Sequence, residues 1–351
     1  MATAREQLAQ FAAGSKALGR LCREYKNRSA TVHLEELVGG ALSFYAAAAV
    51  AESGGVHVFV AEDRDAAAYL LNDFYNLLDE RQVYFFPSSW KRSAAYGAED
   101  AQGVVQRTAA MNAVKGFTKG YLIVCTYPEA LAERVADAET LRRDTIAVKV
   151  GDSISIAVLE DALVDANFTR VDFVYEPGQY SVRGGIVDVF SFSESKPYRI
   201  DFFGDEVDSI RRFNISSQLS ADKLDRVEII PNLNAGDGAA KVSFVQFAGD
   251  AAAYWFYDAD YVLRRVNDIR RKTLADMERP EEIDRLMTSR NALLGDLANC
   301  RMLALRDNLP ERPATAAVEF DTAPQPKFNK NFEMLADDMI RNSLRGYTTY
   351  I

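Results

Sequence analysis

The chain has 351 residues and a formal net charge of −10, from 51 acidic and 41 basic residues. This length predicts two or three domains, and a hydrophobic fraction of 48% is ordinary for a globular protein. Tight, sequence-independent DNA binding requires Lys and Arg to neutralise phosphates. The acidic balance therefore disfavours DNA binding and a membrane role, and it is compatible with a protein partner.

Membrane insertion and metal binding are both disfavoured by the sequence. No apolar run approaches the ~20 residues that span a bilayer, and the start lacks the basic and apolar regions of a signal peptide. Cys22, Cys125 and Cys300 lie far apart and in no CxxC pair, as expected for free thiols in a reducing cytoplasm. His33 and His57 lie in apolar strand patterns typical of a core. We therefore expect a cytoplasmic protein with no metal site and no cofactor.

Strands and helices alternate over the first 140 residues. This alternation is typical of a parallel sheet with helices on both faces. The predicted strands are 31–37, 56–60, 83–86 and 122–125, and the predicted helices are 4–26, 41–52, 63–79, 101–115 and one that begins at Pro128.

The pattern changes after about residue 140. A strand is predicted over 145–150 and a helix over 153–165, and the β-branched and aromatic residues of 175–213 then predict an antiparallel sheet. Pro177-Gly178 indicates a turn, and Gly184-Gly185 indicates a bulge or a close approach of two backbones. This stretch is predicted to be a separate α+β unit.

The C-terminal third reads differently again. Residues 258–306 are predicted to be helical, residues 307–328 are Pro-rich and typical of a linker or extended arm, and Asn331 to Arg345 is predicted to be a last helix. Residues 346–351 begin a strand, so we expect the chain to continue into a further domain. The first helical stretch carries a basic cluster of Arg264, Arg265, Arg270, Arg271 and Lys272.

Two motifs carry a family resemblance. RGGIVDVF at 183–190 and PYRIDFFGDEVDSIR at 197–211 resemble the second domain of transcription-repair coupling factors and, more loosely, the matching domain of the excision-repair protein UvrB. Weaker matches at 85–90, 101–114 and 121–134 extend the resemblance over much of the chain. It implies an α/β fold: a degenerate P-loop NTPase-like domain with a parallel sheet, into which a small α+β domain is inserted.

The resemblance also implies a domain order. A first domain is interrupted by the insert and then completes its own sheet, so the parallel sheet should take strands from before residue 135 and after residue 213. In the family, polymerase-binding and motor domains follow. The expected boundaries are 1–140 and 213–328 for the two parts of the UvrB-like domain, 141–212 for the inserted UvrA-binding-type domain, and 329–351 for a linker helix and the start of a further domain.

A nucleotide-binding fold would place its phosphate loop between the predicted strand at 31–37 and the helix at 41. A working loop supplies backbone N–H groups, a Lys for the phosphates and a hydroxyl for magnesium. Here the glycines and the helix start remain, but no Lys is present, and no Ser or Thr stands at the metal position. ATP hydrolysis is therefore not expected from this degenerate loop, which consists of Gly39, Gly40, Ala41, Leu42 and Ser43.

No other catalytic set stands out. Asp205-Glu206 resembles the acidic pair of a helicase but lies in a Gly-Asp hairpin turn, where solvated carboxylates are expected. Glu35 and Glu36 are adjacent on a predicted strand and would point to opposite faces. Two histidines leave little scope for a Ser/His/Asp triad. We expect no catalytic residue in this chain.

Three arginines in or beside the strands of the second domain predict either local salt bridges or a binding face. Arg is common at interface hot spots because its planar guanidinium forms bidentate hydrogen bonds and its stem packs against apolar surface. The resemblance implies that this domain binds the damage-recognition ATPase UvrA, with contacts at Arg170 and Arg183. Tyr180 and Phe190 are candidate aromatic anchors, although a core position is favoured for Phe190. The full candidate set is Arg170, Tyr180, Arg183, Phe190 and Arg199.

Features for DNA binding are weaker. The aromatic cluster 254–257 before the basic helix could stack bases, but a buried strand followed by a solvated helix face is favoured. UvrB relatives clamp DNA with a tyrosine-bearing hairpin, and the loop between 83–86 and 101 is short, with only Trp90 and Tyr96. DNA binding by this chain is not expected.

The expected function is a non-catalytic interaction module of a transcription-repair coupling factor. It would recruit UvrA to stalled transcription complexes in nucleotide excision repair, and it would contact the polymerase-binding and motor domains of the longer protein. The family resemblance implies that ATP-dependent DNA translocation resides in those domains. The alternatives are a UvrB-like nucleotidase or helicase fragment and a DNA-binding module.

Overall fold

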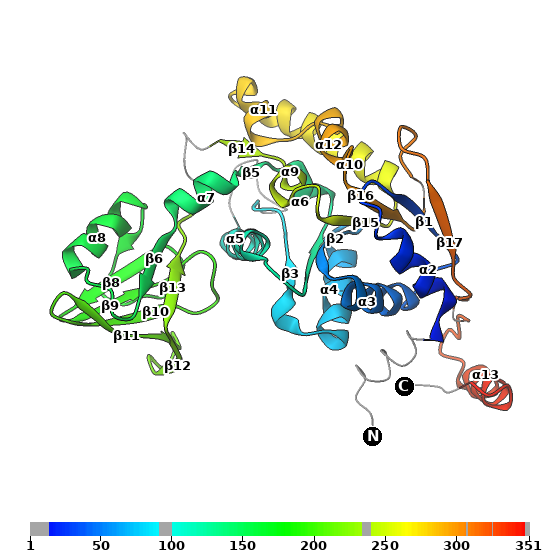
Figure 1. Cartoon of the computed structure of the whole chain (residues 1–351), viewed down its shortest axis with the longest axis horizontal. Helices are drawn as coiled ribbons and strands as arrows, with labels where there is room; N and C mark the ends of the chain where they lie inside the picture. The colour runs from blue at the N-terminus through cyan, green and yellow to red at the C-terminus, as the bar shows by residue number, and fades with distance from the viewer. Residues whose placement is uncertain (1–13, 91–99, 234–239, 307, 325, 348–351) are drawn as a thin grey trace.

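The computed structural model describes residues 14–90, 100–233, 240–306, 308–324 and 326–347. Figure 1 shows two units: a large parallel sheet covered by helices, and a smaller sheet formed by the middle of the chain. Of the helices in these ranges, none combines the length and hydrophobicity needed to traverse a lipid bilayer. Most of the expected strand at 346–351 lies outside these ranges, and so does the loop residue Tyr96.

The larger unit is built on a parallel sheet with seven strands in the described ranges. Its central strands read as continuous apolar runs because both of their faces are buried. The order across the sheet is β17-β1-β16-β15-β2-β4-β3. The strands are β1 (Thr31–Glu35), β2 (Gly55–Val60), β3 (Val83–Phe85), β4 (Tyr121–Thr126), β15 (Ala253–Phe256), β16 (Arg301–Ala304) and β17 (Ala316–Glu319).

Helices cover both faces of this sheet, with α3 and α4 on one side and α10 and α12 on the other (Figure 1). Helix α3 approaches closely because its Ala46, Ala47 and Ala49 are small and buried. The helices of this unit are α2 (Lys16–Glu24), α3 (Ala41–Ser53), α4 (Arg64–Leu77), α5 (Ala101–Gly116), α6 (Pro128–Ala132), α9 (Phe244–Ala248), α10 (Ala259–Asp276), α11 (Ile283–Leu286) and α12 (Arg290–Leu297), with short 3-10 turns η1 (Glu80–Gln82) and η2 (Pro280–Glu282).

The sheet combines strands from both ends of the sequence. β1 lies between β16 and β17, and β15 lies between β16 and β2. The prediction that strands from before residue 135 and after residue 213 share one parallel sheet is confirmed, as is the fold class. The domain boundaries themselves stay a prediction.

Two parts of the C-terminal third differ from their predicted structure. Residues 301–304, predicted to be helical, form β16 in the middle of the sheet, where all four residues are buried. Residues 316–319, within the predicted linker, form the edge strand β17 beside β1. Neither four-residue run is long enough to reveal a strand period, and each is stabilised by pairing with a strand distant in sequence.

The smaller unit is an antiparallel sheet packed on a helix. Its described strands run in the order β12-β11-β10-β9-β8-β7, and only β7 pairs in parallel. The apolar face of this sheet packs on α8, with Leu159 and Leu163 buried against Val187 and Ile200. The elements are β6 (Ile146–Lys149), α8 (Ile156–Asp165), β7 (Thr169–Arg170), β8 (Gln179–Arg183), β9 (Ile186–Val189), β10 (Tyr198–Phe203), β11 (Glu206–Phe213), β12 (Ser220–Leu224) and β13 (Arg226–Ile229).

Gly184 and Gly185 form the two-residue turn between β8 and β9, where Arg183 pairs with Ile186. Gly184 has φ of +60°, which L side chains rarely adopt. A Cβ on Gly185 would lie 3.0 Å from the carbonyl oxygen of Phe202. The predicted close approach is therefore present, and the turn accounts for it without a bulge.

Strand pairing within the smaller unit continues beyond residue 212. β12 pairs with β11, and β13 returns to pair with β6 at the start of the insert. Beyond both units lies α13 (Phe332–Leu344), in which no residue is buried. The connections between the units are α7 (Ala138–Asp144) and the short ribbon of β5 (Val135–Ala136) with β14 (Lys241–Val242).

Candidate partner-binding site

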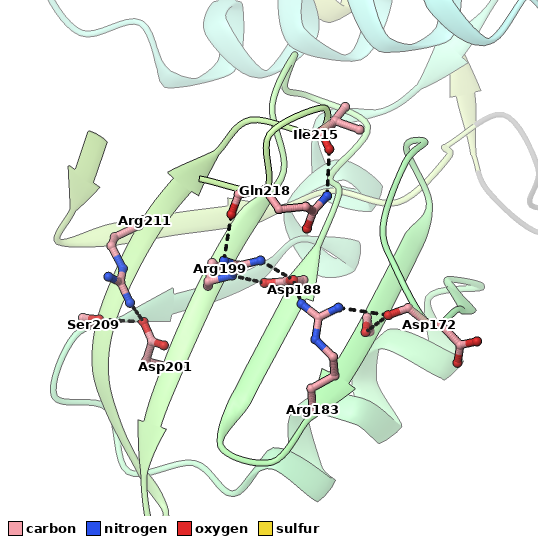
Figure 2. A network of polar contacts seen from close by, with 10 residues as sticks. Asp172, Arg183, Asp188, Arg199, Asp201, Ser209, Arg211, Ile215 and Gln218 are labelled. Atoms are coloured by element: carbon pink, nitrogen blue, oxygen red, sulfur yellow. Dashed lines mark hydrogen bonds and ion pairs between the residues drawn. The ribbon is translucent and has the colours of Figure 1, made fainter. Parts of the chain in front are cut away.

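The two faces of the inserted sheet differ in chemistry. Side chains alternate between faces along a strand, so Tyr180 and Val182 of β8 face α8 while Ser181 and Arg183 face away from it. We call the face that lies away from α8 the polar face. It is the surface of this unit on which charged side chains from several strands meet (Figure 2), and it is formed by Ser181, Arg183, Asp188, Arg199, Asp201, Ser209 and Arg211.

Asp188 is the centre of this face. Its side chain is 1% exposed, and it accepts hydrogen bonds from two arginines (Figure 2). Arg199 donates to both carboxylate oxygens from Nε and Nη2, at 2.7 and 2.9 Å. Arg183 donates from Nη2 at 2.5 Å and from Nη1 to the carbonyl oxygen of Asp172 at 3.0 Å. The Asp188 hydrogen bonds raise the pKa of Arg199 above its ordinary value. Hydrogen bonds to the same buried carboxylate hold both guanidinium groups in position.

A second ion pair continues the network across the sheet. Arg211 on β11 pairs with Asp201 on β10, which also accepts a hydrogen bond from Ser209 at 2.8 Å. Arg199 lies between the two pairs and also donates to the carbonyl oxygen of Gln218. Three guanidinium groups thus share the two carboxylates of Asp188 and Asp201, which leaves one positive charge in excess.

The two aromatic candidates are core residues. Tyr180 lies under α8 with its hydroxyl bonded to Glu160, and burial raises its pKa. Phe190 packs with Val174 and Phe213 in a small cluster at one end of the polar face. Both side chains are buried, as the core interpretation favoured for Phe190 expects, and their role as partner anchors stays a prediction.

The two firmest arginine candidates lie on opposite faces of the sheet. Arg170 pairs in register with Tyr180, and its guanidinium bonds to Glu160 on α8 at 2.7 Å. Arg183 is on the polar face and its side chain is 35% exposed. The prediction that Arg170 and Arg183 contact the same partner is not tested by this geometry, which requires such a partner to extend around the edge strand β7.

The sequence did not single out Asp188 and Arg211. Arg199 and Asp201 alternate in one predicted strand, and Asp201 is a candidate salt-bridge partner, but the actual partner of each charge depends on strand register. β10 places Arg199 opposite Asp188 of β9 and Arg211 of β11. The sequence pattern does not give that register, so it cannot show which of these charged side chains form pairs.

The degenerate phosphate loop borders a pocket of about 330 Å³ at the carboxyl ends of β2, β15 and β16. In an open parallel sheet this is the usual place for a ligand. The charged residues among those lining it are Glu62 and Asp73, and no Lys or Arg is among the described residues at its wall. The hydroxyl of Ser43 donates to Asp73 at 2.5 Å. The lining described therefore lacks the positive charge that a phosphate requires, and the Ser43 hydroxyl of the degenerate loop is already bonded.

The features considered for DNA binding have structural roles. Residues 254–256 form the buried strand β15. The arginines of α10 are engaged in ion pairs rather than aligned as a phosphate track. These pairs are Arg264 with Asp260, Arg265 with Glu129, Arg270 with Asp284 and Arg271 with Asp268. Lys272 is exposed.

Buried polar groups elsewhere support the fold. His57 accepts a hydrogen bond from Trp255 at 3.1 Å and contacts the Tyr25 hydroxyl, and burial lowers its pKa to about 4. Arg107 and Glu133 form a buried pair that fixes the chain after β3. Among the described residues no group of three His, Cys, Asp or Glu is placed to hold a metal ion.

Comparison with known protein families gives a match over the inserted unit. Residues 146–234 match the family described as the UvrB interaction domain, and the match covers the inserted unit with its polar face. The inserted unit is therefore similar to domains of the UvrB interaction class.

About half of the chain is similar to transcription-repair-coupling factors. It is 29% identical to that of Bacillus subtilis (strain 168) over 199 residues, which is 56% of this chain and 17% of the relative. It is 28% identical to that of Escherichia coli (strain K12) over the same length and shares. These matches confirm the resemblance to the N-terminal region of this family, and the chain covers only about one sixth of the relatives' length.

Proposed function

We propose that this chain is a non-catalytic interaction module that binds UvrA and recruits it to stalled transcription complexes during nucleotide excision repair. The observation that carries the proposal is the polar face, where Asp188 holds Arg183 and Arg199 in fixed positions within a domain of the UvrB interaction class. Arginines held in place in this way lose little side-chain entropy on binding.

The absence of catalysis rests on the phosphate-loop pocket. Its position matches that of a nucleotide site, but its charged lining residues are Glu62 and Asp73, which would repel phosphates. No described feature favours the alternative of a DNA-binding module, because the arginines of α10 are paired and residues 254–256 are buried.

The proposal is tested by measuring binding of the chain to UvrA by calorimetry, with Arg183→Ala and Arg183→Glu. Truncating a hot-spot arginine commonly costs ~2 kcal/mol, or roughly a thirty-fold loss of affinity. Charge reversal should be worse because it adds repulsion to the lost contact. Arg226→Glu is the matched control, since Arg226 is exposed on β13 in a local pair with Glu228, outside the polar face.

The expected result is wild-type binding that both Arg183 variants weaken and Arg226→Glu does not. Arg183→Ala should change the melting temperature little because Arg199 still bonds both carboxylate oxygens of Asp188. Arg183→Glu places a second carboxylate beside the buried Asp188 and should lower the melting temperature. Wild-type affinity in both Arg183 variants contradicts the assignment of the polar face. A parallel titration with ATP and magnesium tests the rival enzyme function, and saturable micromolar binding would support a nucleotidase instead.

A further inference from the structure

The segment between β7 and β8 folds back over one edge of the polar face. The hydroxyl of Ser181 and the guanidinium of Arg183 both donate to the carbonyl oxygen of Asp172, at 2.9 and 3.0 Å. Two residues further on, Val174 is fully buried against Phe190 and Phe213. The segment is therefore attached to the sheet by hydrogen bonds and an apolar contact.

This attachment turns two aromatic side chains outward. Phe173 is 49% exposed and Tyr175 is 58% exposed, on either side of the buried Val174. The backbone N–H groups of Tyr175 and Glu176 donate to the side-chain oxygen of Gln179, at 2.9 and 3.1 Å. Exposed aromatic rings on a backbone held in this way need little ordering on binding.

Phe173 and Arg183 form one composite surface. The Cζ atom of Arg183 lies 4.9 Å from the centroid of the Phe173 ring, within the range of a cation–π contact. Arg183 uses two of its five N–H donors, one to Asp172 and one to Asp188. Its remaining donors are available to carboxylates or carbonyls of a partner, and the ring beside them is available to apolar groups.

We propose that Phe173 and Tyr175 are the aromatic anchors of the UvrA-binding surface, in place of the buried Tyr180 and Phe190. This inference rests on the proposed function and names the residues that supply its apolar contacts. Interface hot spots are enriched in aromatic residues and arginine. The excess positive charge of the polar face complements a partner patch that presents carboxylates beside an apolar pocket.

The test measures UvrA binding by the whole chain with Phe173→Ala, Tyr175→Ala and the double variant. Tyr69→Ala is the matched control, because Tyr69 on α4 of the larger unit is 78% exposed. We expect each single variant to weaken binding by roughly ten-fold or more and the double variant further. The melting temperature should not change, because both side chains are exposed.

Phe173→Leu separates ring chemistry from hydrophobic contact. It keeps an apolar side chain but loses the ring face against Arg183, so its affinity should lie between those of wild type and Phe173→Ala. Wild-type affinity in the double variant, while Arg183→Glu still weakens binding, overturns the anchor assignment alone. Failure of the wild-type chain to bind UvrA overturns both the proposed function and this inference.

Discussion

The phosphate-loop pocket lies in the larger unit and the polar face lies in the smaller unit. The pocket has the position of a ligand site without suitable charges, whereas the polar face has charged groups held in position. The pocket keeps the geometry of a ligand site at the carboxyl ends of a parallel sheet, but its charges are Glu62 and Asp73. The polar face instead fixes Arg183 and Arg199 on a buried carboxylate. The larger unit thus has the position of a phosphate site without positively charged lining residues. In the smaller unit, strand register brings the charged side chains together.

The comparison depends most on Asp188. Asp188→Ala leaves two arginines facing each other without their shared carboxylate, and breaking a buried ion pair in this way costs about 3 kcal/mol or more. We expect a fall of that size in the free energy of unfolding, measured by urea denaturation, together with loss of UvrA binding. Asp188→Asn keeps the hydrogen-bond acceptor and should lose less. If Asp188→Ala unfolds like wild type, the network is not a structural centre.

The stability of the larger unit should depend on pH through His57, which is buried in its neutral form. Burial lowers the pKa of His57 to about 4, from 6.5. Between these pH values the unfolded chain binds a proton that the folded chain excludes, so stability falls as the pH drops from 6.5 to 4. The expected loss is about 3 kcal/mol by pH 4. His57→Gln should be less stable at pH 7 but should show a flatter dependence over this range, and an equally steep profile would contradict the assignment.

The separation of Arg170 from Arg183 sharpens the location of the binding face. Arg183→Ala should weaken UvrA binding by ~2 kcal/mol, whereas Arg170→Ala should cost less because Arg170 faces α8 and already pairs with Glu160. The measurement is the ratio of the two dissociation constants by calorimetry. Equal losses would indicate a partner that wraps around β7 rather than one that sits on the polar face.

The smallest expected effect concerns the pocket. Ser43→Ala removes the hydroxyl that donates to Asp73 and should reduce the free energy of unfolding by about 1 kcal/mol. UvrA affinity should remain that of wild type, because this pocket belongs to the other unit. A change in affinity without a change in stability would connect the pocket to partner binding and would break the contrast between the two regions.

The larger fold could be predicted where local pattern and tertiary role agree. The β-α alternation before residue 140 and the hairpins around 183–190 and 197–211 have enough residues to show a period. β16 and β17 do not, because four-residue strands are stabilised by partners hundreds of positions away in the chain. Their local sequences carry too little periodic signal to compete with the helical and Pro-rich surroundings.

By itself, the sequence determined which functional groups are available. It places Arg183 in the family motif, and it has no Lys after Gly40 in the loop where a nucleotide-binding protein would carry one. Only the tertiary structure decided which side chains meet. Strand pairing set Arg199 against Asp188 and placed Arg170 on the opposite face, since neighbouring side chains on a strand point to opposite sides. Burial, which depends on every element packed around a residue, turned Tyr180 inward, while the attachment of its own segment to the sheet turned Phe173 outward.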